Sequence, residues 1–158
     1  AIYRGTVDSL DALPDGASIA VPNDTTNEAR ALQLLAAQGL ITLKEGAGLT
    51  ATKNDIIDNP HGYDIKEMEA ALLPTVLDEV AVAVINGNYA LGAGLSSNDS
   101  LAAEDAASEA AQTFANVLVV KEGNENSEKI QALKEALLSD TVRDYITNTY
   151  NGAVVAIF

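Results

Sequence analysis

Two short polar segments of the sequence carry side chains that could bind a small charged molecule. The first is residues 23–30, which follow the apolar run 18–22 and lead into a helical pattern. Unpaired amides and the positive end of a helix favour an anion there. Arg30 lies in the second turn and could hold a carboxylate in a charge-assisted, bidentate bond worth about 1.5–3 kcal/mol. The alternative interpretation is a surface arginine that pairs with Glu28 or another nearby acid.

The second polar segment begins at Asn86, directly after the apolar run 80–85. A side-chain amide at the end of a buried strand offers both a donor and an acceptor, which suits a zwitterion. In open α/β sheets, ligands bind beyond the carboxyl ends of the strands. The alternative is that Asn86 only caps a helix that starts near Tyr89.

Catalytic and metal chemistry find little support in the sequence. The single histidine, His61, lies in a turn-like segment, and the chain has no cysteine. No nucleophile elbow, zinc-protease helix or phosphate-binding loop is present. The acidic pairs at 78–79 and 104–105 are interpreted as solvated. The sequence therefore predicts a protein that is not an enzyme, with no cofactor and no metal.

The charge balance restricts the possible partners. The chain has 23 acidic and 9 basic residues, a formal net charge of −14. Such a surface repels phosphate backbones and anionic lipid headgroups, which excludes nucleic acid as a partner. Its ordinary explanation is solubility, and the alternative is an acidic face that docks a partner protein. No apolar run approaches the roughly 18–20 residues of a membrane span.

Short apolar runs alternate with longer helical patterns, which predicts an α/β fold with a parallel sheet. The strands are expected at 18–22, 41–43, 64–68, 80–85 and 117–120. The helices are expected at 70–78, 101–112, 127–138 and 140–150, with one helical turn at 54–58. Continuous small and β-branched residues at 80–85 predict a strand that is covered on both faces.

The helix that follows residue 24 has the clearest end signals. Thr25 and Glu28 stand in capping-box spacing, so Thr25 is expected to be the N-cap and Glu28 to reach back to its amide. Gly39 fits the C-terminal stop of this helix. The helix would then begin within the first polar segment.

Five blocks of the sequence resemble the methionine-binding (NlpA-type) lipoproteins. The segment IAVPNDTTNEARAL at 19–32 resembles the strand-to-helix block of that family, and VINGNYA at 84–90 resembles its second fingerprint. Residues 9–17, 116–123 and 150–154 resemble further blocks. The blocks come in family order and span nearly the whole chain, so together they are specific.

This resemblance implies a two-lobed, type II periplasmic-binding fold, anchored by lipid outside the cytoplasmic membrane. A protein of this kind delivers methionine to the membrane subunits of an ABC importer. By resemblance, Arg30 grips the α-carboxylate of the ligand, while Asn27 and Asn86 bind its polar backbone groups. Asn23 and Tyr89 are further candidates that shape the neighbouring loops. The alternative ligands are another apolar amino acid and a short peptide. The alternative function is that of an effector-sensing domain with the same fold.

Two features depart from the family pattern. The family usually has proline where this chain has Thr25, a change that should preserve the turn because threonine caps helices well. The N-terminal portion of the pattern, with the lipid-bearing cysteine and the aromatic wall around the methionine side chain, has no counterpart here. The resemblance then assigns 1–8 to a crossover strand, 9–115 to the second lobe, and 116–158 to the return strand and C-terminal helices of the first lobe.

This assignment predicts association. Without partner strands, residues 116–158 should leave apolar surface exposed, which favours a dimer or packing against an N-terminal fragment. Solution scattering of the purified chain should show a species larger than a monomer. A sharp monomer peak with no co-purifying peptide would contradict this expectation.

Overall fold

The computed structural model describes residues 1–150 and 152–158, with Ser97 described by its backbone alone. Asn151, which belongs to the last block of the family resemblance, lies outside the described residues. The chain divides into two units, Ala1–Glu104 and Asp105–Phe158, which are described separately. Within the described part of the chain, every helix is too short or too polar to cross a membrane.

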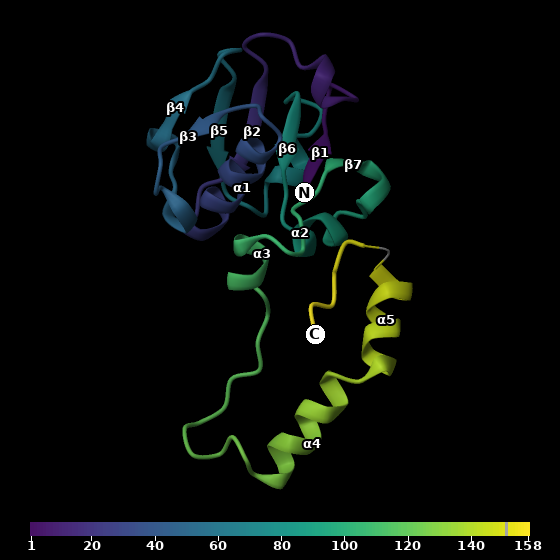
Figure 1. Cartoon of the computed structure of the whole chain (residues 1–158). Helices are drawn as coiled ribbons and strands as arrows, with labels where there is room; N and C mark the ends of the chain where they lie inside the picture. Colours follow the sequence, from purple (N-terminus) through teal and green to yellow (C-terminus); the bar gives the residue numbers. More distant parts are fainter. Residues whose placement is uncertain (151) are drawn as a thin grey trace. The chain divides into compact units, whose positions relative to one another are not determined.

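The first unit is built around a five-stranded sheet with the strand order β5-β2-β6-β1-β7 (Figure 1). Its strands are β1 (Ile2–Arg4), β2 (Ser18–Pro22), β5 (Asp64–Met68), β6 (Val82–Val84) and β7 (Ser100–Ala102). The prediction of a parallel sheet is correct for β5, β2 and β6. It is wrong for β1, which runs antiparallel to both β6 and β7. Apolar runs predict that strands exist, but they carry no information on the direction in which a strand runs relative to its neighbours.

The remaining elements of this unit surround the sheet. A two-stranded antiparallel sheet consists of β3 (Thr42–Leu43) and β4 (Ile56–Asp58). The helices are α1 (Thr25–Ala37) and α2 (Gly87–Gly92), and the single 3₁₀ turns are η1 (Leu10–Ala12), η2 (Gly48–Thr50), η3 (Lys53–Asp55), η4 (Leu73–Val76) and η5 (Ser97–Asp99).

Both faces of the central sheet are buried. Ile19 and Val21 of β2 point to a core with α1, where Leu32 and Leu35 are fully buried. The intervening Ala20 points to a second core on the other face. Residues of β6 alternate between these cores in the same way, so the expectation of a strand covered on both sides is confirmed.

The N-cap of helix α1 lies one residue earlier than the sequence predicts. Asp24, not Thr25, is the N-cap, and its carboxylate accepts a hydrogen bond from the backbone N–H of Asn27 at 3.1 Å. Asp24 has extended backbone angles whereas Thr25 is already helical. The predicted stop is confirmed, because Gly39 adopts a positive φ of 72° just beyond the helix end.

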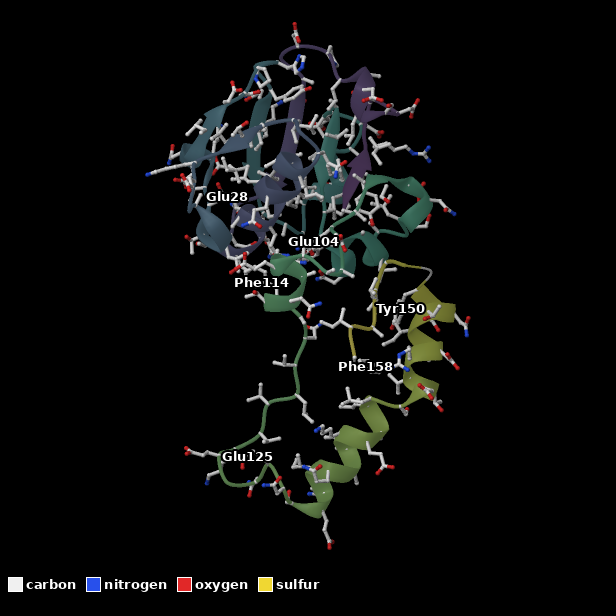
Figure 2. All side chains as sticks on the ribbon, viewed as in Figure 1. Glu28, Glu104, Phe114, Glu125, Tyr150 and Phe158 are labelled. Atoms are coloured by element: carbon white, nitrogen blue, oxygen red, sulfur yellow. The ribbon has the colours of Figure 1, made fainter. Side chains whose placement is uncertain are left out.

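Glu28 therefore makes a different contact from the one expected of a capping box. Its side chain is buried, with 5% of its surface exposed, and Oε1 accepts the backbone N–H of Lys53 at 2.8 Å. Burial raises the pKa of this carboxyl, and the hydrogen bond from Lys53 partly opposes that rise. Figure 2 labels Glu28 on the first unit. The contact joins α1 to η3.

The other expected elements of the first unit are partly wrong. The helix expected at 70–78 is reduced to η4, with Pro74 in its first turn, and the turn expected at 54–58 is η3 followed by β4. The helix expected at 101–112 is replaced by β7 and the short α3 (Glu109–Thr113). The alanine-rich sequence has helix propensity, but pairing with β1 takes residues 100–102 into the sheet.

The second unit contains two amphipathic helices where they were expected, α4 (Glu128–Leu137) and α5 (Asp140–Tyr150). The buried strand expected at 117–120 is wrong. Val117 and Val119 are 75% and 81% exposed, and among the described residues no strand pairs with this segment. An apolar run becomes a strand only where another strand supplies its hydrogen bonds. Leu133, Leu137, Tyr145 and Val155 of this unit are also exposed.

The close approach at Gly5 gives a stability prediction. A Cβ at this position would lie 2.2 Å from the carbonyl oxygen of Val80 and 2.6 Å from that of Leu77. Gly5→Ala should therefore lower the free energy of unfolding by roughly 1–3 kcal/mol, measured by urea denaturation. Gly92→Ala is the matched control, because nothing lies within 4 Å of its Cβ position. Equal stability of the two variants would contradict the prediction.

Candidate ligand-binding site

Parallel pairing brings the two polar segments to one edge of the sheet. In β2 and β6, Ile19 is opposite Val82 and Ala20 is opposite Ala83. Both strands run in the same direction, so their carboxyl ends lie side by side. The residues that follow them, Asn23 and Asn86, are therefore at the same edge, where α1 also begins. This is the position at which open α/β sheets bind ligands.

Two of the predicted site residues are in direct contact. Nδ2 of Asn86 donates to Oδ1 of Asn27 at 2.7 Å. Nδ2 of Asn27 in turn lies 3.0 Å from each carboxylate oxygen of Asp24. At the other end of this series, Oδ1 of Asn86 is buried and accepts no hydrogen bond from any described residue. Asp24 was not among the predicted site residues, although aspartate is a common N-cap.

Asn86 is at the N-cap position of α2, but its side chain makes no capping hydrogen bond. Asn86 therefore occupies the cap position, as the alternative interpretation expects, but its side chain does not cap the helix. The amide contacts Asn27 instead, 59 residues away in the sequence.

Arg30 lies one helical turn beyond Asn27, so the two side chains share a face of α1. Its guanidinium binds Glu104 through Nε to Oε1 at 3.2 Å and Nη2 to Oε2 at 2.5 Å. The two side chains are 28% and 22% exposed. Arg30 therefore pairs with an acid, as the alternative interpretation expects, and that acid is Glu104. The expectation that Glu104 is solvated is wrong. Sequence separation hid this pair, because its members are 74 positions apart in the chain.

The start of β1 lies beside the end of β6. The backbone nitrogen of Ala1 donates to the carbonyl oxygen of Ile85 at 3.1 Å, one residue before Asn86.

The two remaining candidates lie at the margins of the cluster. The backbone N–H of Asn23 donates to the carbonyl oxygen of Met68 at 2.9 Å, which extends the pairing of β2 with β5, and its side chain is exposed. Tyr89 is half-buried in the first turn of α2 and packs against the second core. Their roles in binding remain predictions.

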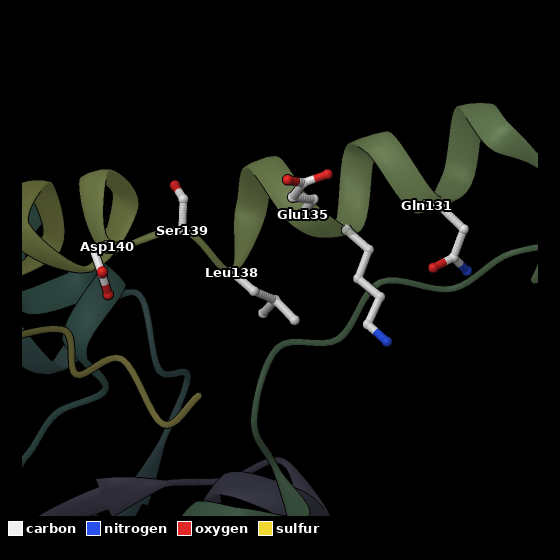
Figure 3. A pocket seen from close by; sticks show the side chains of 6 residues that line it. Gln131, Glu135, Leu138, Ser139 and Asp140 are labelled. Atoms are coloured by element: carbon white, nitrogen blue, oxygen red, sulfur yellow. The ribbon is translucent and has the colours of Figure 1, made fainter.

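A separate pocket lies in the second unit, and none of the predicted site residues lines it (Figure 3). It is open and mostly polar, and it is formed by Gln131, Lys134, Glu135, Leu138, Ser139 and Asp140. No group of three or more metal-ligating side chains occurs within the part of the chain that the structure describes. The cluster of Asp24, Asn27, Arg30 and Asn86 at the edge of the sheet is therefore the better candidate for the ligand-binding site.

The sequence profile of the NlpA lipoproteins matches residues 1–158. The chain belongs to the NlpA lipoprotein family. Among curated members, the membrane lipoprotein TpN32 of Treponema pallidum is 49% identical over 99% of this chain and 57% of its own length. The D-methionine-binding lipoprotein MetQ of Escherichia coli is 40% identical over 97% of this chain and 56% of its own length. The chain thus spans little more than half the length of these NlpA relatives.

Solved structures of similar proteins confirm the fold class. A lipoprotein from Ruminococcus gnavus matches with a TM-score of 0.87 and 59% identity, over 98% of this chain and 64% of that one. A nutrient-binding protein from Burkholderia cenocepacia, solved bound to methionine, matches with a TM-score of 0.83 and 39% identity, over 99% and 65% of the two chains. The predicted α/β fold of the periplasmic-binding-protein type is therefore confirmed.

The Arg30–Glu104 pair gives a quantitative prediction. A double-mutant cycle with Arg30→Met and Glu104→Gln should show a coupling energy of about 0.5–3 kcal/mol, because the pair is bidentate and mostly shielded from water. The Arg4–Asp99 pair, 52% and 29% exposed, is the matched control and should couple by less than about 1 kcal/mol. Urea denaturation measures both cycles. A larger coupling for the control pair would contradict the assignment.

Proposed function

We propose that the chain is part of an extracytoplasmic substrate-binding protein that delivers an amino acid, methionine, to an ABC importer. The observation that carries the proposal is the contact of Asn27 with Asn86 at the edge of the sheet, one helical turn from Arg30. Two polar amides beside a guanidinium suit the amino and carboxylate groups of a zwitterion.

The relatives support methionine as the ligand. Several are named as D-methionine-binding lipoproteins, and one related structure was solved bound to methionine. Arg30 would bind the ligand carboxylate, whereas Asn27 and Asn86 would bind polar groups of the ligand backbone. Asn23 and Tyr89 would shape the rim. Another apolar amino acid, or a short peptide, would satisfy the same backbone contacts and is the alternative ligand.

This function is binding and release, and no bond in the ligand is broken. The protein would not be an enzyme. By its family, it would be anchored to the membrane through a lipid and would dock on the membrane subunits of the importer. An effector-sensing domain of the same fold is the alternative from a different class, and it would need a DNA-binding or catalytic partner.

The division of the chain into lobes is part of the proposal. Residues 9–115 would form the second lobe, 1–8 a crossover strand, and 116–158 the C-terminal part of the first lobe. Residues 117–120 are not a strand in this structure and would become the return strand only when the first lobe supplies a pairing strand. The exposed apolar residues of the second unit, such as Val117 and Val119, support this assignment because a lobe would cover them. The side chain of the ligand would then contact residues outside this chain.

Ligand titration tests the proposal. L-methionine is titrated into the ¹⁵N-labelled chain, and into a chimera in which the chain replaces its matching region of the Treponema pallidum lipoprotein. Saturable shifts should appear at Asn27, Arg30 and Asn86. Arg30→Met should weaken binding by about 10- to 100-fold, as expected for charge-assisted bonds. Arg4→Met removes the same charge from an exposed pair and should leave the affinity unchanged.

Two results would overturn the proposal. One is the absence of shifts with L-methionine and other apolar amino acids in both proteins. The other is equal weakening by Arg30→Met and Arg4→Met, since the guanidinium of Arg30 would then have no special role.

A further inference from the structure

We propose that Asp24 is a positioning residue: its carboxylate orients the amides of Asn27 and Asn86, so that Asn86 presents a hydrogen-bond acceptor to the ammonium group of the ligand. The inference rests on the proposed function, because it assigns one contact of the amino acid at that site.

The direction of each hydrogen bond follows from the carboxylate. An ionised carboxylate accepts hydrogen bonds and donates none. The group of Asn27 that lies 3.0 Å from both Asp24 oxygens must therefore be its NH₂. The oxygen of Asn27 then faces Asn86 and can only accept, so Asn86 turns its own NH₂ toward Asn27 at 2.7 Å. The orientation of an isolated amide is ambiguous, but the acid at the end of this series removes the ambiguity.

The group that is left at the far end is the oxygen of Asn86. It is buried and has no donor among the described residues. A buried acceptor without a donor costs free energy that a ligand N–H would recover. An ammonium group has three N–H donors, whereas a carboxylate has none and would be repelled. Asn86 would thus bind the amino end of the ligand and Arg30 the carboxylate end, which sets the orientation of the zwitterion.

Asp24 is also the N-cap of α1, so capping must be separated from orientation. Asp24→Ser keeps the cap, because a serine hydroxyl can accept the backbone N–H of Asn27. It removes the carboxylate that holds the NH₂ of Asn27, so both amides become free to rotate. Asp24→Asn is the charge control, because the Asp24 oxygen that caps the helix also accepts the NH₂ of Asn27, and an asparagine oxygen can keep both contacts.

The first experiment measures bond direction in the 158-residue chain without ligand. NMR should detect a through-hydrogen-bond coupling from the side-chain nitrogen of Asn86 to the side-chain carbonyl carbon of Asn27. This coupling should fall in Asp24→Ser while thermal stability is retained. A coupling in the opposite direction in the unchanged chain, or an unaltered coupling in Asp24→Ser, would overturn the proposal.

The second experiment compares L-methionine with 4-(methylthio)butanoate, the same molecule without its amino group. Asp24→Ser should weaken the binding of L-methionine by about tenfold or more and change the affinity for the second probe by less than about twofold. Asp11→Asn removes an exposed charge far from the amides in sequence and should affect neither probe. The selectivity should persist at high salt, which screens a simple charge effect.

Equal losses for the two probes would overturn the proposal, since they would show that Asp24 acts only on the fold. If neither probe binds the unchanged chain or the chimera, the proposed function fails, and the NMR coupling still decides whether Asp24 orients the amides.

Discussion

Parallel pairing of β2 with β6 is the constraint on which the candidate site depends. Ile19 and Ala20 are held opposite Val82 and Ala83, so the register at the ends of these strands is set by the core. A shift by one residue would exchange the two faces of the sheet and force Ile19 and Val21 into the core where the smaller Ala20 now packs. The same burial that stabilises the sheet therefore places Asn86 beside the first turn of α1.

A series of polar contacts is built on this frame. Asp24 ends the extended segment, caps α1 and contacts Asn27, which contacts Asn86. The amide of Asn27 has a partner on both sides and that of Asn86 has one on one side, so the rotation of both amides is restricted before any ligand arrives. Preorganised polar groups bind more tightly because less conformational entropy is lost on binding. The Arg30–Glu104 pair restricts the guanidinium in the same way.

The two units of the chain differ in how completely they bury their apolar residues. In the first, Ile2, Ile19, Leu32, Leu35 and Leu73 are essentially inaccessible to water. In the second, leucines and valines of α4, of residues 117–119 and of the C-terminal segment remain exposed. Its helices pack little of their apolar faces, although Arg143 stacks on Phe158 at 5.1 Å and pairs with Asp140. The family fold would give these faces a partner, which agrees with the length of the relatives.

The sequence by itself determined the elements whose signals are local. β2, β5, α4 and α5 were predicted close to their observed bounds, because periodicity and end signals lie within each segment. The resemblance likewise supplied Asn27, Arg30 and Asn86 as candidates. Three features were decided only by tertiary structure: the Arg30–Glu104 pair, the antiparallel β1, and the exposed coil at 117–120. Each depends on residues distant in sequence. Arg30 needs a carboxylate, β1 needs neighbouring strands, and residues 117–120 have no pairing strand among the described residues. Local propensity carries no information about such partners.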